Sequence, residues 1–538
     1  MVSSPARSSS SRASWWITFV LVGAVGSCWA LASPPYSAVD EPLHVVKAVS
    51  IAGGQWVGDA LPNDEIPDGS IYRDGWVTFD VPSVYGEAEE SSRCFRGEDV
   101  TEPASCFSFT GSRDTVSVIS LDPRYPPAYY LTVGLPARLV PDGPNAVRVM
   151  RLVSVAIVAA LLASAVRSLC RIDRPTPALV GLVVATTPMV FHLAGSVNPN
   201  GVEIGAAVAL WASGLVLVRE APGEVDLRVV TRVAVAALIL VLSRPASPLF
   251  ALLILLALLL LAGRASLMAL LRSWPTRLAA GAIAVAAVAQ LTWNQFVQPN
   301  YFGTPIPDVV PRSDVVRFAF GKTIGYLQQS IGVFGAPDFQ VNTLTILIWA
   351  ALSGGLGLLA VAVARRRFLL VMIAVAVAAV VIPVVADVSQ ADRFTYAWQG
   401  RYTMPLVLGL PLLAGVGIAS SAPASILLRR RLLLATAGAF ALGQFLAYAE
   451  FLQRYTVGID GPLLFALDPV WRPPVPAVLL LLVVLIGVSL FGALPMVVRS
   501  DRSELVEQRV VGDATTTAHS RAVEHDVRDQ MREPDQRP

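Results

Sequence analysis

Charge is scarce in this chain. Only 15% of its 538 residues are Asp, Glu, Lys or Arg, whereas soluble domains contain about 25% charged residues. Apolar residues make up 54% of the chain, and its mean hydropathy is +0.60. This composition excludes a cytosolic globular enzyme, a disordered scaffold and a nucleic-acid-binding protein. It predicts an all-α, polytopic helix bundle that spans a membrane.

Cysteine, lysine and the motifs of soluble enzymes are also scarce or absent. Four cysteines in 538 residues cannot build a disulfide scaffold. Of 41 basic residues only Lys47 and Lys322 are lysines, and this arginine bias favours a GC-rich bacterial source. The sequence contains no Walker loop, dinucleotide fingerprint, nucleophile elbow, HExxH or CxxC motif. We therefore expect energy or activated groups to come from the lipid phase or from outside the cell.

Long apolar runs are what the sequence has instead. Runs of about 17–25 apolar residues predict transmembrane helices. Only Ser243, Arg244 and Pro245 separate the fifth run from the sixth, so these two are either separate spans or one broken pair with a tight outer turn. The twelve predicted spans are 15–33, 152–169, 176–194, 201–218, 229–243, 246–263, 278–297, 343–364, 368–388, 402–420, 432–450 and 476–498.

Arginine clusters predict the orientation of these spans. Six alternate connections carry 17 basic residues and four acidic ones, so the positive-inside rule places these connections in the cytoplasm. Both termini, residues 1–14 and 499–538, then face the cytoplasmic side of the plasma membrane. The tail 499–538 is charged and has no apolar period, which predicts disorder. Trp15, Trp16 and Trp29 are placed as interfacial anchors, so we expect the first span to be retained and not cleaved as a signal peptide.

Two long segments fall on the opposite side of the predicted membrane. Residues 34–147 form a first extracytoplasmic loop with 17 acidic and 7 basic residues. Cys94 and Cys106 both lie in it, in an oxidising compartment, which predicts a disulfide between them; two reduced thiols are the alternative. Residues 298–342 form the second long outer segment, and its amphipathic stretch near Val315–Ile331 predicts a helix in the membrane interface.

Ionisable residues follow the first span directly. Asp40, His44 and Lys47 are spaced i, i+4 and i+7, which places them on one face if the segment is helical. A carboxylate, an imidazole and an amine held together at the membrane surface could bind a metal or a phosphate, or remove a proton. The alternative interpretation is that Asp40 caps the helix and that the face is solvated.

Further polar residues gather at the predicted outer ends of the spans. Each of them alone is explained as an interfacial anchor or a turn. Together on one side of the membrane, the arginines suit a phosphate or diphosphate group, which guanidinium binds through two hydrogen bonds. The candidates for substrate binding are His44, Lys47, Arg151, Asn198, Asn200, Glu203, Arg244, Lys322, Gln399, Arg401, Tyr402 and Arg454.

Several of these motifs resemble those of a family of bacterial multi-pass proteins, domain-of-unknown-function family 2142. The resemblance rests on five motifs that together span most of residues 15–498. They are Asp40-Glu41-Pro42-x-His44, Asn198-Pro199-Asn200-Gly201 with Glu203, Gly332-Val333-Phe334-Gly335, Gln399-Gly400-Arg401-Tyr402 and Arg454-Tyr455-x-Val457-Gly458.

The layout is also similar to that of the GT-C glycosyltransferases, in which one span precedes a large outer loop that begins with an acidic pair. In this sequence that pair is Asp40 and Glu41. The resemblance implies a polyprenyl-phosphate-linked sugar as donor and a cell-wall or lipid-linked glycan as acceptor. It also implies that the carboxylates act as base, or as ligands of a divalent metal such as Mg²⁺ or Mn²⁺.

Two other classes of function stay open. A transporter or flippase of lipid-linked glycans would place ionisable groups near the bilayer midplane, on discontinuous helices. Here the polar residues near the midplane are few, Gln290 and Gln444, and the charges lie at outer ends. A membrane scaffold that binds protein partners is the third class. The transferase prediction accounts best for the outer charges and for the long acidic loop.

The predicted topology can be tested by cysteine labelling. We expect cysteines introduced at Ser70 and Ser503 to react with a membrane-impermeant maleimide from opposite sides, because the arginine-rich connections place the tail inside. Intact cells and permeabilised cells provide the two conditions of the measurement. Labelling of both positions in intact cells would overturn the topology.

Overall fold

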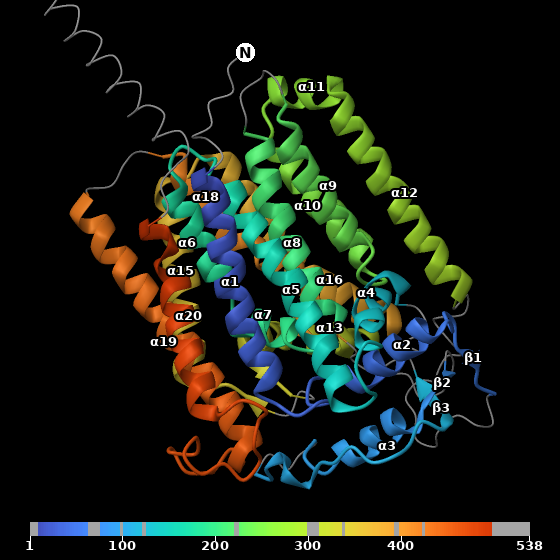
Figure 1. The fold of residues 1–538 in the computed structure, drawn as a ribbon. Helices are drawn as coiled ribbons and strands as arrows, with labels where there is room; N and C mark the ends of the chain where they lie inside the picture. Colours follow the sequence, from blue (N-terminus) through green and yellow to red (C-terminus); the bar gives the residue numbers. More distant parts are fainter. Residues whose placement is uncertain are drawn as a thin grey trace, which may run out of the picture.

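The structure of the chain, a computed structural model, describes nine stretches of residues (Figure 1). They are 9–62, 76–96, 101–120, 125–219, 225–297, 311–335, 339–391, 398–421 and 426–497. The predicted cytoplasmic tail 499–538 lies outside the described residues. So do residues 1–8 of the N-terminus and residues 298–310 of the second outer segment.

Helix α8 (Pro199–Leu217) is the centre of the bundle, since every one of its residues is buried. A helix that is apolar on all sides can be stable only where other helices or lipid surround it. Helices α5 (Pro144–Leu169) and α9 (Leu227–Val241) pack directly against α8. Helix α1 (Ser9–Leu31) packs along α5 and along α20 (Ala477–Val497), which closes the bundle with the last span (Figure 1).

The other long helices form the outer part of the bundle. Helix α12 is its most peripheral member and packs mainly on α9 (Figure 1). The remaining helices of the bundle are α6 (Pro175–Ala185), α7 (Pro188–Ala194), α10 (Ser247–Leu261), α11 (Arg264–Arg272), α12 (Trp274–Val297), α15 (Thr343–Val363), α16 (Arg366–Gln390), α17 (Gly400–Val407), α18 (Gly409–Ala419) and α19 (Ile426–Val457).

Each of the twelve predicted spans falls on a helix or on a broken helix, which confirms a polytopic bundle of roughly the expected size. Among the described residues nine helices are long and apolar enough to cross a membrane, or ten if the bent pair α6 and α7 is one span. Helices α9 and α10 occupy the fifth and sixth predicted spans. With 15 residues each they are about 22 Å long, short of the roughly 30 Å hydrocarbon core. They form a short hairpin around residues 242–246.

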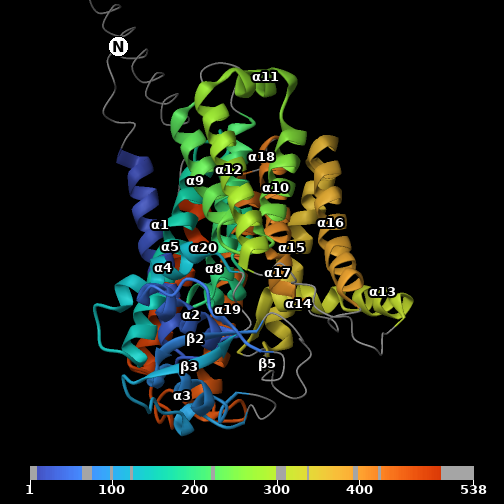
Figure 2. The same cartoon turned by 90° about the vertical axis from the view of Figure 1, so that its right-hand side faces the viewer.

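The connections segregate to two ends of the bundle. Helix α11, with Arg264 and Arg272, lies at the end where the chain begins, and the connection between α15 and α16 lies at the same end (Figures 1 and 2). The strands and helix α3 lie at the opposite end, called here the loop end. This segregation is the one that the arginine pattern predicts.

The first long loop builds a layer across the loop end. Helices α2 (Glu41–Gly53) and α4 (Pro127–Ala137) pack against each other, and a side chain at Gly134 would place its Cβ only 2.4 Å from the Ala48 carbonyl oxygen. Beyond them lies an antiparallel sheet with strand order β1-β2-β3, in which Val77 pairs with Ser120. The strands of this sheet are β1 (Asp59–Ala60), β2 (Val77–Pro82) and β3 (Thr115–Ser120). Between β2 and β3 the chain forms the helices α3 (Ser83–Ser92) and η3 (Ala104–Cys106).

The second outer segment contributes a smaller set of elements at the same end. The helices α13 (Arg312–Gly321) and α14 (Thr323–Gly332) cover the predicted amphipathic stretch. The two-residue strands β4 (Val333–Phe334) and β5 (Phe339–Gln340) pair antiparallel just after them.

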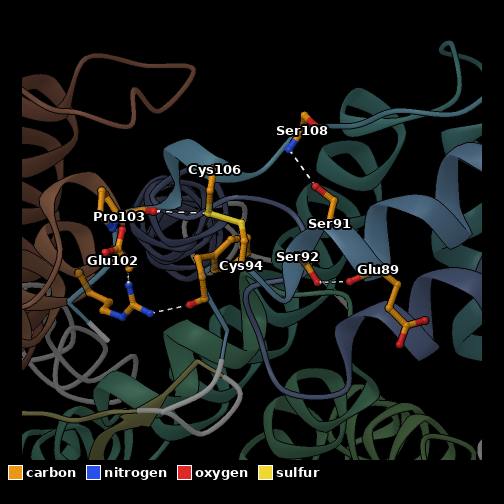
Figure 3. Close-up of a disulfide and its surroundings, with 10 residues drawn as sticks. Glu89, Ser91, Ser92, Cys94, Glu102, Pro103, Cys106 and Ser108 are labelled. Atoms are coloured by element: carbon orange, nitrogen blue, oxygen red, sulfur yellow. Dashed lines mark hydrogen bonds between the residues drawn. A yellow bond between two sulfur atoms is a disulfide. The ribbon is translucent and has the colours of Figure 1, made fainter. Parts of the chain in front are cut away.

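A disulfide joins Cys94 to Cys106, and Figure 3 shows its surroundings. The loop that it closes docks on the end of α19. Arg454 donates hydrogen bonds to the carbonyl oxygens of Phe95 at 2.6 Å and Glu102 at 2.7 Å. The disulfide therefore helps to hold the two carbonyl groups that accept hydrogen bonds from Arg454.

The disulfide gives a direct chemical prediction. We expect Cys94 and Cys106 to resist alkylation in the purified, unreduced protein. We expect Cys28 and Cys170, both buried and neither in a disulfide among the described residues, to react after denaturation. Mass spectrometry of an unreduced, alkylated digest measures all four. Alkylated Cys94 and Cys106 peptides would reject the bridge.

Candidate functional site

Asp40 lies in an unusual backbone conformation at the loop end. Its φ is 58° and its ψ is 3°, the left-handed region that few residues other than glycine adopt. Asp40 is the N-cap residue of α2, and its carbonyl accepts a hydrogen bond from the N–H of His44, but its side chain caps no backbone N–H group. The face with His44 and Lys47 is buried, so the interpretation as a solvated face is wrong. The Oδ2 atom of Asp40 instead accepts a hydrogen bond of 2.5 Å from Nη2 of Arg401, the second residue of α17. The left-handed backbone conformation of Asp40 costs about 1–3 kcal/mol, and it occurs where the Asp40 side chain contacts Arg401, a residue distant in the sequence.

Glu41 points in another direction, although it is the next residue. It is fully buried and pairs with Arg151 of α5, with Nε at 2.7 Å from Oε1 and Nη2 at 2.5 Å from Oε2. The backbone N–H of Val197 donates a third hydrogen bond to Oε1. Arg151 also donates to the carbonyl oxygens of Ala30 and Pro34. The acidic pair of the sequence is therefore divided between two separate ion pairs.

A second arginine lies beside Arg401. The guanidinium carbon atoms of Arg244 and Arg401 lie 4.4 Å and 5.0 Å from the ring centroid of Tyr402. Arg244 pairs with Glu203 of α8 at 3.1 Å, and Ser247 donates a 2.5 Å hydrogen bond to the other oxygen of Glu203. These contacts hold the turn between α9 and α10 against the central helix.

Both guanidinium groups keep an unused donor. The side chains of Arg401 and Arg244 are only 5% and 8% exposed. The Nε atom of each is buried and has no acceptor within the part of the chain that the structure describes. A buried donor without an acceptor costs about 1–3 kcal/mol, so an oxygen-rich anion at this position would be stabilised.

His44 and Lys47 form the other side of the cluster. Nδ1 of His44 lies 2.9 Å from the hydroxyl of Tyr130. Burial lowers the pKa of His44 to about 3, with Arg401 and Arg244 acting in the same direction and Asp40 against it, so the imidazole is neutral near pH 7.

Tyr125 connects the two sides. Nζ of Lys47 lies 5.2 Å from the Tyr130 ring centroid and 6.0 Å from the Tyr125 ring centroid. The hydroxyl of Tyr125 accepts a 3.4 Å hydrogen bond from Arg244.

The structure gathers half of the predicted site residues into one cluster. Asn198 caps α8 and donates to the Val39 carbonyl at 3.1 Å, and its Oδ1 accepts from the N–H of Asn200. Gln399 precedes α17, and its carbonyl accepts from the N–H of Tyr402. Lys322 is exposed at the junction of α13 and α14, and Arg454 serves the disulfide loop. The cluster itself consists of Asp40, His44, Lys47, Glu203, Arg244, Arg401 and Tyr402.

Three further residues of the cluster were not among the candidates. Tyr125 and Tyr130 belong to a Tyr-Pro-Pro-x-Tyr-Tyr stretch, and an aromatic run in an acidic loop is a signal that could have found them. Ser247 follows Arg244 by three residues at the start of an apolar helix. Its hydroxyl is fully buried, and only its partner Glu203, on another helix, makes its role recognisable.

The donor set does not fit a divalent metal. Within the described residues no group of three or more His, Cys, Asp and Glu side chains could hold one. Both oxygens of Glu41 are occupied by Arg151, and a guanidinium already lies against Asp40. A metal held by Asp40 and Glu41 stays a prediction that this geometry does not support.

Comparisons with known proteins give a family and a distant structural likeness. The model of a family described as "Predicted membrane protein (DUF2142)" matches residues 23–410. No curated protein matches the chain. The chain resembles the crystal structure of ArnT from Cupriavidus metallidurans bound to undecaprenyl phosphate, with 14% identity, over 90% of this chain and 77% of that chain. The TM-score of 0.43 makes this likeness too distant to support a functional argument.

The buried ion pair gives a stability prediction. Glu41→Gln leaves the Arg151 charge without a buried partner, so we expect a loss of about 3–5 kcal/mol and a clearly lower Tm in detergent. The matched control is Asp226→Asn, because Asp226 pairs with Arg171 at 2.7 Å but both side chains are about one third exposed. That variant should lose less than about 1 kcal/mol. Equal Tm shifts in the two variants would contradict the assigned role of Glu41.

Proposed function

Since the chain belongs to the DUF2142 family of predicted membrane proteins, we propose that it is a GT-C-type glycosyltransferase embedded in the plasma membrane. It transfers a sugar from a polyprenyl-phosphate donor to a cell-envelope acceptor, a cell-wall or lipid-linked glycan, at the outer face. One observation carries the proposal: Arg244 and Arg401 flank Tyr402 beside Asp40, and each keeps a buried Nε–H group without an acceptor among the described residues.

The two arginines support the binding of the donor phosphate. Guanidinium groups bind phosphate oxygens through two parallel hydrogen bonds, and they stay charged when buried. Lys47 adds a third cation next to Tyr125. Because the site lies at the ends of membrane helices, a polyprenyl chain can remain in the bilayer while its phosphate reaches the arginines.

Asp40 supports the removal of a proton from the acceptor. Its side chain is 37% exposed, whereas Glu41 is fully buried and engaged by Arg151, so Asp40 is the better base of the two. Asp40 takes the proton of the acceptor hydroxyl, and the oxygen of that hydroxyl forms a bond to the anomeric carbon of the sugar. The bond between that carbon and the phosphate oxygen breaks, and the polyprenyl phosphate leaves with the electron pair.

The ion pair between Asp40 and Arg401 links donor binding to the accessibility of the Asp40 carboxylate. Nη2 of Arg401 occupies Oδ2 of Asp40, so this oxygen cannot at the same time accept the proton of an acceptor hydroxyl. A phosphate competes for the same guanidinium, so donor binding would free Asp40 for proton removal. The ion pair between Asp40 and Arg401 is therefore the arrangement of the site before the donor binds, and donor binding breaks it.

A transporter of lipid-linked glycans remains the second candidate, because one observation favours it. Helices α6 and α7 form a span broken by 65° near Thr186, and transporters bind substrate at such breaks. In this chain Gln444 donates a 2.7 Å hydrogen bond to the Thr186 carbonyl, and no charged side chain is involved in that contact. The break thus offers a satisfied backbone and not an ion site, which favours the transferase.

Two substitutions test the proposed chemistry. Asp40→Asn keeps the size of the side chain, so the protein should fold while activity drops on the order of a hundredfold or more. Arg401→Lys keeps the charge but loses the guanidinium group that forms two parallel hydrogen bonds to a phosphate. The KM for the polyprenyl-phosphate sugar should therefore rise roughly tenfold or more. The measurement uses membranes and a radiolabelled polyprenyl-phosphate sugar, with Tm values to verify folding. Asp460→Asn, an exposed aspartate, is the control.

Loss of the gene identifies the sugar. Mass spectrometry of cell-envelope glycans in the deletion strain should show one sugar missing and its polyprenyl-phosphate donor accumulating. Full activity of Asp40→Asn would remove Asp40 as the base. Loss of a whole glycan from the envelope, with its lipid-linked form accumulating on the inner leaflet, would instead favour the transporter.

A further inference from the structure

Helices α13 and α14 present an unpartnered face at the loop end. Figure 2 shows α13 lying across the direction of the spanning helices, beside the end of α16. Three apolar side chains are largely exposed, with Phe320 at 52%, Ile324 at 70% and Leu327 at 47%. The exposed charged residues of this segment are Arg312, Asp314, Arg317 and Lys322. Apolar side chains accompanied by an excess of cations are typical of a helix that lies in a membrane interface.

The opposite face of α14 is bound to the segment that carries Arg401. Oε1 of Gln329 accepts a 2.5 Å hydrogen bond from the N–H of Gly400, the first residue of α17. The hydroxyl of Tyr326 donates to Asp387 at 3.3 Å, and the other oxygen of Asp387 accepts from the N–H of Trp398. Gln329 thus acts as the cap of α17, because the side chain of Gln399 makes no capping hydrogen bond.

Gly400 allows this close packing. A Cβ atom at this position would lie 2.2 Å from the Tyr326 carbonyl oxygen, so any larger residue would push α14 away from α17. The backbone of α14 and the first turn of α17 are therefore held as one unit. A displacement of α14 would be passed on to Arg401, which is the next residue after Gly400.

We propose that α13 and α14 bind an anionic lipid surface and that this binding holds Arg401 against Asp40. Arg312, Arg317 and Lys322 would contact lipid phosphates, while Phe320, Ile324 and Leu327 enter the interface. A lipid surface is the occupant because the pair packs on α15 and α16, two membrane-spanning helices, at the level where these helices end. Only the consequence for catalysis rests on the proposed function; the lipid contact does not.

The proposal assigns Lys322 and Gln329 a different role from that of the site residues. Lys322 lies with its Nζ 5.0 Å from the ring centroid of Phe318, on the exposed side of the pair. It therefore binds lipid and not the donor phosphate. Gln329 is a positioning residue that acts on Arg401 through the N–H of Gly400.

Hydrogen exchange in lipid nanodiscs tests the coupling. The full chain is placed in phosphatidylcholine alone, or with one part phosphatidylglycerol to two parts phosphatidylcholine. We expect the amides of residues 400–402 to exchange more slowly with the anionic lipid. In the variant Arg317→Gln/Lys322→Gln this protection should fall on the order of thirtyfold, since each cation near an anionic surface contributes about a fivefold preference.

The matched control is Arg93→Gln/Arg113→Gln, which removes two exposed arginines from the first loop and should not change the exchange of residues 400–402. A spin label at Ile324 should report a depth within the interface, whereas a label at Arg113 should not. Exchange that is equal in both lipids and in both variants would overturn the proposal. A lipid response without any transferase activity would leave it intact and reject the proposed function instead.

Discussion

The pair between Glu41 and Arg151 is the constraint on which the site depends. Two charges with almost no exposure to solvent are stable only if their hydrogen-bonding groups find partners. Arg151 meets this demand by binding the carbonyl groups of Ala30 and Pro34 as well as Glu41, so the end of α1, the start of α2 and α5 are held together. With Glu41 fixed, the chain at Asp40 adopts a left-handed conformation, and that conformation directs the Asp40 carboxylate toward Arg401.

The neighbouring carboxylates therefore differ in what they can do. Glu41 has its oxygens occupied by a guanidinium and a backbone N–H, which makes it a structural anion. Asp40 is partly exposed and shares only one oxygen with a cation that a substrate could also bind. A pair of adjacent acidic residues in a sequence thus describes two separate environments, because successive residues at the start of a helix point in different directions.

The sequence predicts the bundle well and the site in part, for different reasons. Apolar runs specify spans because lipid requires them, and arginine clusters separate the two ends of the bundle. Which outer ends adjoin is a matter of helix packing, for which a single sequence carries no signal. Arg401 and Arg454 both belong to outer-end motifs, yet only Arg401 meets Asp40, while Arg454 holds the disulfide loop. The short strands of the first loop were not expected, since pairs such as that of Val77 with Ser120 join distant positions.

The burial of Arg244 follows from its place in the turn between two short helices. Helices α9 and α10 have 15 residues each, and the turn between them brings Arg244 to Tyr402 at the start of α17. Arg244 in that turn is buried, and its buried guanidinium is stabilised by a carboxylate. Glu203 supplies it from the first turns of α8, the most buried helix of the bundle. The ion pair with Glu203 therefore holds a second arginine beside Tyr402, next to the contact between Arg401 and Asp40.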